Sequence, residues 1–270
     1  MRVTATILIA LFLLVTSEVF SQILVGPVAG ANFSWVSFDD KDLKGTYKVI
    51  PMWGYHAGMH VAFKVRKRFF LHSSFLYSTK GKVIEGKDDE YLRNEVKYSY
   101  IDVPILYTVD FKGKIGKSKE FKYYLGIGPN ISYWLGGKGT FNNSELVEVF
   151  EPELSYKVVF KQDEDNLPDD QMNVADPNRL QLGLAFGAGL EFEPAPRQRM
   201  MLTLRYELGH TFFSKTSDGY FSSVLTYQDE MRSRNQGLRL SVAYLVDLKT
   251  AERKKGKSTI NKNKLNKKRR

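Results

Sequence analysis

Three of the four histidines fall where two neighbouring segments could bring them together. His56 and His60 are four residues apart in one segment, and His72 follows in the next. If a turn at residues 65–67 closes a hairpin, His60 lies opposite His72, and such a pair could bind a metal ion or respond to protons. His56 would lie ~13 Å farther along the strand at ~3.3 Å per residue, so the three could not share one ion. The alternative is ordinary polar packing in the interior, and we expect no metal and no cofactor.

Charged side chains also recur inside otherwise apolar segments. Acids and bases in such positions can pair if the segments close around a narrow interior. The predicted interior charge network comprises Asp102, Glu191, Arg205, Glu207 and Arg239. Paired, these groups would plug the interior; left apart, they would line a conducting pore. Glycines beside them point to a closed, salt-bridged interior.

Residues 136–179 form the longest stretch between the patterned segments, and they carry ten acids and four bases. Oxygen ligands of the kind that Ca²⁺ prefers cluster in DEDNLPDD at 163–170, although the spacing is not that of an EF-hand. A solvated acidic loop is the alternative. Because long loops commonly carry function, we expect any external partner to bind here.

Catalysis has little support in the residues. The chain has no cysteine, which excludes thiol chemistry and disulfides. His210, with Thr211 and Ser214 nearby, gives a weak hydrolase-like signal without a defined triad. We therefore expect no enzyme activity.

The last 22 residues, 249–270, hold eleven lysines and arginines and one acid. Their charge of +10 equals that of the whole chain, so the rest sums to zero. Such a segment cannot bury a core, and we expect a disordered basic tail. Its clusters are Lys254, Lys255, Lys267, Lys268, Arg269 and Arg270.

Eight segments of period two would position these groups. In residues 55–64, for example, large apolar side chains alternate with histidine, glycine and lysine, which is the pattern of a β-strand. The predicted strands are 24–35, 55–64, 69–80, 99–111, 121–135, 180–193, 200–212 and 236–248. Their length suits tilted membrane strands, which need ~9–11 residues.

The connections alternate between short basic turns and long polar stretches, as in outer-membrane barrels. That alternation puts both ends of the barrel in the periplasm. Residues 1–21 have the charged start, the apolar run at 5–15 and the small residues of a cleaved secretion signal. The expected organisation is a signal peptide at 1–21, a barrel at 22–248 and the tail at 249–270.

The glycine-rich face of the strands decides which side is inside. Glycine on an exposed strand packs nothing, but in an eight-stranded barrel it makes room for large interior side chains. The apolar face would then meet lipid, with aromatic residues near strand ends forming interfacial girdles. These are Trp35, Trp53, Tyr98, Tyr107, Tyr133, Tyr206 and Tyr244. The alternative is a soluble lipocalin-like barrel.

Several segments taken in order, above all YIDVP followed by YYLGIGP, resemble the PorT-like outer-membrane β-barrel family of Bacteroidota. The resemblance covers about residues 24–248 and implies an eight-stranded outer-membrane barrel; some relatives serve type IX secretion and gliding. The acidic loop and the basic tail depart from the simplest family pattern.

We therefore expect an all-β, eight-stranded, antiparallel, up-and-down transmembrane barrel in a bacterial outer membrane. The predicted role is that of a non-enzymatic structural or interaction protein with a plugged lumen, for example an accessory to secretion or motility machinery. A narrow porin-like channel for small solutes or ions is the alternative. Expected contacts are outer-membrane lipid, an external partner at 136–179 and a periplasmic anionic partner at the tail. A periplasmic tail excludes nucleic acid as a partner.

Overall fold

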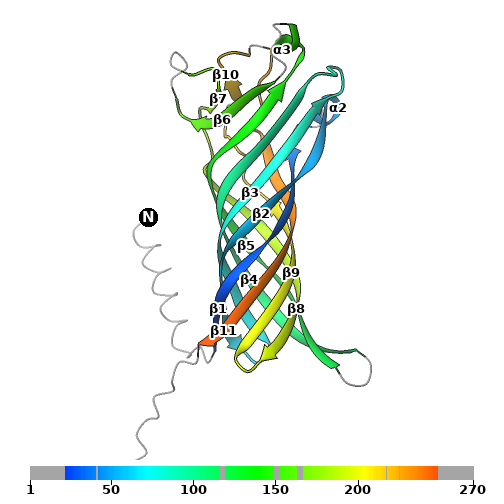
Figure 1. Ribbon diagram of the computed structural model, residues 1–270, viewed down its shortest axis with the longest axis vertical. Helices are drawn as coiled ribbons and strands as arrows, with labels where there is room; N and C mark the ends of the chain where they lie inside the picture. The colour runs from blue at the N-terminus through cyan, green and yellow to red at the C-terminus, as the bar shows by residue number, and fades with distance from the viewer. Residues whose placement is uncertain are drawn as a thin grey trace, which may run out of the picture.

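Eight long antiparallel strands close into a ring in the computed structural model, which describes residues 22–40, 42–115, 119–148, 153–162, 167–216, 218–224 and 226–248. The ring closes because the first strand pairs with the last and because β5 pairs with β8 (Figure 1). In order around the ring, the strands are β1 (Ile23–Phe38), β2 (Tyr47–Arg66), β3 (Phe69–Gly86), β4 (Arg93–Ile115), β5 (Lys119–Asn142), β8 (Leu180–Ala195), β9 (Gln198–Gly209) and β11 (Ser233–Leu248).

The expectation of eight strands is correct for the ring and too low for the chain. Three short strands extend the sheet from β5 at one end of the ring: β6 (Leu154–Phe160), β7 (Gln171–Val174) and β10 (Gly219–Phe221). The pair β6–β7 is parallel, so this extension is not part of an up-and-down meander. Two short helices, α2 (Leu43–Thr46) and α3 (Ser144–Glu148), lie at the same end (Figure 1).

Apart from β9, which stops at Gly209 and not at residue 212, the ring strands also run past their predicted ends. Residues 81–86 and 93–97, expected in a loop, are paired strand, and β5 continues to Asn142. These extensions carry exposed charged residues together with buried apolar ones such as Ile84 and Phe141, so the alternation of the membrane zone does not continue into them. Cross-strand ion pairs stabilise them instead: Glu85 accepts hydrogen bonds from Lys48 at 3.0 Å and from Arg93 at 2.5 Å.

Large apolar side chains cover the outside of the ring, and polar side chains fill its inside. Leu182, Leu204 and Leu240 are about half exposed, whereas Asp102, Arg205 and Arg239 are buried. The period-two pattern thus places its apolar face outward, as expected for a membrane barrel. No helix among the described residues is both long and apolar enough to cross a membrane.

The two ends of the ring differ. Short turns at 67–68 and 196–197 lie at the end where Ile23 pairs with Leu248. The long connections lie at the opposite end, together with α2, α3, β6, β7 and β10 (Figure 1). The predicted alternation of short and long connections is therefore present.

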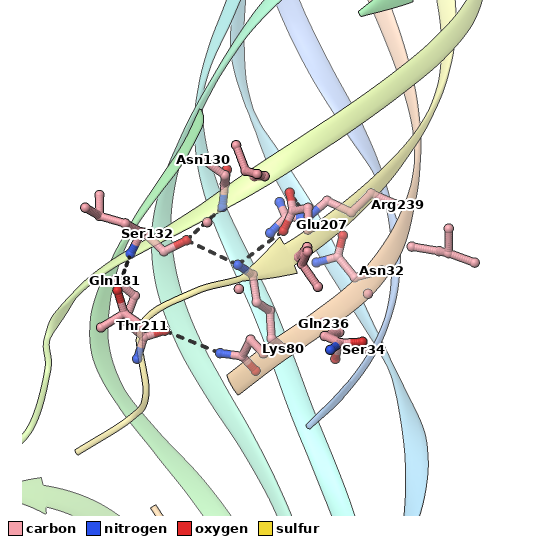
Figure 2. Close-up of a pocket in the computed structure, with 18 of the residues that line it drawn as sticks. Asn32, Ser34, Lys80, Asn130, Ser132, Gln181, Glu207, Thr211, Gln236 and Arg239 are labelled. Carbon is pink, nitrogen blue, oxygen red and sulfur yellow. Dashed lines mark hydrogen bonds and ion pairs between the residues drawn. The ribbon is translucent and has the colours of Figure 1, made fainter. Parts of the chain in front are cut away.

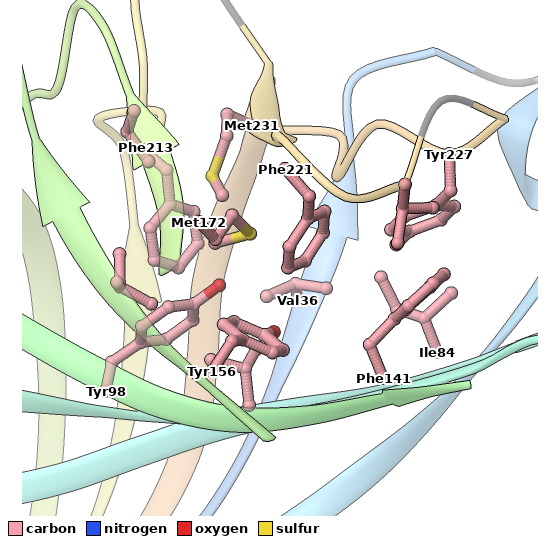
Figure 3. Packing of buried hydrophobic residues seen from close by; sticks show 14 of the residues in the cluster. Val36, Ile84, Tyr98, Phe141, Tyr156, Met172, Phe213, Phe221, Tyr227 and Met231 are labelled. Atoms are coloured by element: carbon pink, nitrogen blue, oxygen red, sulfur yellow. The ribbon is translucent and has the colours of Figure 1, made fainter. Parts of the chain in front are cut away.

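The end with the long connections is closed by a packed aromatic core, called the cap below. Residues of the 210–232 connection fold inward against β4, β5 and β6 rather than forming a solvated loop (Figure 3). Tyr98, predicted for an interfacial girdle, is fully buried in this core. Its large members are Tyr98, Tyr100, Trp134, Phe141, Tyr156, Met172, Phe213, Phe221, Tyr227 and Met231.

Candidate functional site

Below the cap, five charged side chains meet in the middle of the ring. Asp102 accepts hydrogen bonds from Lys80, at 3.0 Å, and from Arg239. Glu207 lies 2.8 Å from Arg239 Nε, 3.1 Å from Arg205 Nε and 3.4 Å from Lys80 Nζ. Figure 2 shows Lys80 reaching between Ser132 and Glu207. All five are buried, so each charge depends on the others for the solvation that water would provide.

The strand register explains why this network needs partners from across the ring. Arg205 on β9 lies directly opposite Arg239 on β11, and like charges in that position repel. Asp102, on β4, reaches Arg239 across the interior, and hydroxyls of Ser78 and Ser132 complete its shell. Three bases and two acids give the network a formal charge of +1. The ring therefore closes over a cross-linked charge cluster.

Lys80 is the member that the sequence analysis missed. It follows His72, Ser74 and Ser78 at even positions, so the same period-two pattern placed it on the inner face. The predicted strand 69–80 ends at Lys80, beside a loop. Lysine at a strand end commonly faces solvent, and only the continuation of β3 to Gly86 buries it.

Glu191 does not belong to this network, contrary to expectation. It pairs with Arg199 at 2.6 Å and lies 3.9 Å from Lys122. On β8, Gly187 is the residue opposite Arg205, and Glu191 lies four residues beyond it, or ~13 Å at ~3.3 Å per residue. Period two assigned the correct face to Glu191 but gave no information on its height.

The three predicted histidines lie inside the ring in two separate groups. His56 hydrogen-bonds Asn32 at 2.6 Å and Ser241 at 2.8 Å, and a side chain on Gly30 would collide with its ring. His60 hydrogen-bonds His72 at 3.0 Å and Ser74 at 2.8 Å.

The predicted pairing of the last two is corrected in register. His60 lies opposite Ser74, and His72 opposite Ala62, because β2 has an irregularity between Lys64 and Arg66. His72 also stacks on Tyr124, with ring centroids 5.4 Å apart. Both nitrogens of His60 are therefore engaged by protein groups. In the described parts of the chain, no three His, Cys, Asp or Glu side chains gather as a metal site would require.

Two small cavities lie inside the ring. A cavity of about 30 Å³ lies beside the charge network, lined by Asn32, Lys80, Asn130, Ser132, Glu207 and Arg239, among others (Figure 2). A second, of about 20 Å³, lies beside His60 and His72. Since a water molecule needs at least ~10–15 Å³ measured in this way, each holds only one or two waters.

A second buried ion pair fastens the cap to the ring. Lys82 Nζ lies 2.7 Å from Asp229 Oδ1, and both side chains are fully buried. Tyr227 donates a hydrogen bond to Asp229 at 3.2 Å and accepts one from Asn94, which accepts one from Tyr156. Burial, followed by the nearby Asp229 charge, raises the pKa of Tyr156 and Tyr227 well above the usual value, so both phenols stay protonated donors.

The remaining predicted sites are only partly visible. Acids 163–165 and the signal and tail regions, 1–21 and 249–270, lie outside the described residues. The hydroxyl of Ser214 donates to the backbone carbonyl of Asp176 at 2.9 Å, and that of Thr211 accepts from the backbone N–H of Leu182 at 3.0 Å. These contacts to the backbone do not form a triad with His210.

A closed ring of antiparallel strands with an apolar outside and a polar inside defines an outer-membrane β-barrel. The sequence matches the family described as outer membrane protein beta-barrel domain over residues 17–211. The chain belongs to that family and is an integral protein of a bacterial outer membrane.

Solved structures show similarity at low sequence identity. Ail, the attachment invasion locus protein of Yersinia pestis, is 15% identical, with 83% of this chain and 99% of that chain covered and a TM-score of 0.34. OprG from Pseudomonas aeruginosa is 8% identical, with 84% and 96% covered and a TM-score of 0.48. Neisserial surface protein A is 11% identical, with 84% and 97% covered and a TM-score of 0.35. The curated proteins contain no match.

Proposed function

We propose that the chain is a sealed, non-enzymatic barrel that acts as a structural or interaction protein of the outer membrane. The observation that carries this proposal is the filled interior. The cap, the network around Asp102 and the histidine layer follow one another along the axis, and the cavities between them hold only a few waters. Such an interior supports the barrel and leaves no path for a solute.

The proposed orientation puts the cap outside the cell and both ends of the barrel in the periplasm. Short turns at the periplasmic end and long outer connections are the usual arrangement. An external partner would then meet the 136–179 region, and the basic tail would reach periplasmic anions. The resemblance to PorT-like proteins is compatible with an accessory role in secretion or motility.

A narrow channel is the second candidate, favoured by the polar lining. Two guanidinium nitrogens, Arg205 Nη2 and Arg239 Nη1, have no hydrogen-bond partner among the described residues. Waters at these atoms would give a discontinuous polar path, blocked above by the cap.

Ion flux into vesicles separates the two candidates. Barrel refolded into phosphatidylcholine vesicles that enclose a potassium-sensitive dye should admit potassium no faster than vesicles without protein. Steady flux that scales with the number of barrels would favour the channel.

Orientation has its own test, since a chain without cysteine accepts single reporter thiols. A cysteine in place of Asp88, which is exposed in the connection between β3 and β4, should react with a membrane-impermeant maleimide on intact cells. Labelling only after the outer membrane is disrupted would reverse the proposed topology.

A further inference from the structure

Three lysines stand side by side on the outward surface of the ring, above its apolar zone. Lys97 on β4 lies directly opposite Lys138 on β5, and Lys138 lies directly opposite Lys157 on β6. All three side chains are exposed. This group is called the lysine row below. Neighbouring positions in a sheet are ~4.5–5.5 Å apart at Cβ, so the ammonium groups can converge on one small anion.

The lysine row is short of acids, in contrast to the neighbouring surface. Among the described residues, neither Lys97 nor Lys138 has an acidic partner within 4.0 Å, and Lys157 has a distant one, Asp170 at 3.7 Å. Four residues away along β4, Arg93 is paired with Glu85 and Glu95. The same sheet therefore neutralises its cations at one level and concentrates them at another. Like charges placed directly opposite destabilise a sheet unless something binds between them.

The lysine row lines a hollow in the surface. This hollow has a volume of about 510 Å³, and its other lining residues include Met52, Tyr156, Thr140 and the two acids Glu95 and Asp170. Glu95 is already paired with Arg93, and Asp170 with Lys157. The three lysines and two acids of the lining leave a formal charge of +1 for an incoming anion.

The height of the lysine row matches the head groups of the lipid. Ile101 is the last apolar residue on the outward face of β4 before Ser99 and Lys97, and it lies opposite the exposed Tyr77 and Tyr133, which sit where an interfacial girdle would be. Lys97 is four residues farther along β4, or ~13 Å at ~3.3 Å per residue. At a strand tilt of ~45°, this is about 9 Å above the aromatic residues, among the phosphates.

We propose that the lysine row binds a phosphate group on the head of an outer-leaflet glycolipid, the lipid A part of lipopolysaccharide. This inference rests on the proposed orientation, because that lipid occupies the outer leaflet. Lysine ammonium groups bind phosphate as point charges, and two neighbours in the row can share one phosphate. The bound lipid would neutralise the lysine row and fix the barrel within its leaflet.

The test uses native mass spectrometry of the full mature barrel in detergent, titrated with bisphosphorylated lipid A. Each lysine near a charged surface contributes about a fivefold gain in affinity, so replacing all three with serine should weaken binding on the order of 100-fold. Lipid A without its phosphates should bind the wild type as weakly as bisphosphorylated lipid A binds the serine variant. Inorganic phosphate should not displace the lipid, because it lacks the acyl chains that sit on the apolar wall.

Two control variants isolate the lysine row. Replacement of all three lysines with arginine should keep the affinity within about threefold, since guanidinium also binds phosphate. Replacement of Lys44, Lys48 and Lys87 with serine removes the same charge from three exposed lysines elsewhere on the outer end. This variant should also keep its affinity for lipid A within about threefold of the wild type. Heat-dependent gel mobility confirms that every variant is folded.

Retained affinity in the serine variant of the lysine row, or equal binding of the dephosphorylated lipid, would overturn the inference. Failure of the orientation itself is recognised separately: a cysteine at position 88, outside the lysine row, would then stay unlabelled on intact cells. Labelling from outside combined with unchanged lipid binding would refute the lysine row alone.

Discussion

The substitution Asp102→Asn probes the charge network most sharply, because it keeps the shape of the side chain and removes its charge. Asp102 is fully buried and accepts hydrogen bonds from Lys80, Arg239, Ser78 and Ser132. Without it, three buried bases share Glu207, and the formal charge of the network rises from +1 to +2. Breaking a buried ion pair in this way costs ~3–5 kcal/mol.

Urea unfolding in phosphatidylcholine vesicles, followed by tryptophan fluorescence, measures this cost. With a slope of about 2 kcal/mol per molar urea, the midpoint should fall by about 2 M. Glu85→Gln is the matched control, because Glu85 holds two cations at the exposed end of the same sheet. Exposed pairs contribute ~0–1 kcal/mol, so its midpoint should move by less than about 0.5 M.

A double variant checks the physical reason. Asp102→Asn combined with Arg239→Met removes the orphaned guanidinium, so it should be less destabilised than Asp102→Asn alone. If Asp102→Asn unfolds at the same urea concentration as the wild type, the network does not stabilise the barrel and the reasoning fails.

Three further predictions concern the cap, the lipid-facing wall and the outer sheet. Lys82→Met leaves Asp229 buried without its cation and should lower the free energy of unfolding by ~3–5 kcal/mol. The 210–232 connection should then become open to protease, and uncut protein would contradict the proposed fastening. Leu204→Arg puts a charge on the exposed apolar face and should cost ~2–4 kcal/mol in vesicles, against little change for Leu204→Met. Hydrogen bonding to Lys48, then the charges of Lys48 and Arg93, lower the pKa of Glu85. The ionised acid therefore stabilises the fold above its unfolded pKa of about 4.5, and this contribution is lost as the pH falls through its folded pKa. The difference in urea midpoint between wild type and Glu85→Gln should thus be small at pH 7 and shrink as the solution is acidified; a difference that grows on acidification has the wrong sign.

The ring could be predicted from the sequence because its strands obey one simple rule. Period two separates lipid-facing from interior residues, and glycine on one face distinguishes a narrow interior from a solvated exterior. Gly189 illustrates this, since a side chain there would collide with the ring of Tyr124. The interior positions of Asp102, Arg205 and Arg239 follow from the same rule.

The rest depends on register and on packing between distant segments, which alternation does not encode. The separate location of Glu191 depends on the register between β8 and β9. The offset of His60 from His72 depends on an irregularity in β2. The cap depends on contacts such as Lys82 with Asp229, 147 residues apart in the chain. The cap residues from Phe213 to Met231 lie between two predicted strands, and their apolar content has no period.

The sealed interior is the central claim, and single-channel recording in planar bilayers tests it most directly. The wild-type barrel should show no unitary conductance under voltage in potassium chloride. A variant with serine at Lys80, Arg205 and Arg239, combined with a deletion of 210–232, should conduct and so prove insertion. Discrete, reproducible openings of the wild type, with one fixed unitary conductance and a total current that rises with the number of inserted barrels, would contradict the account.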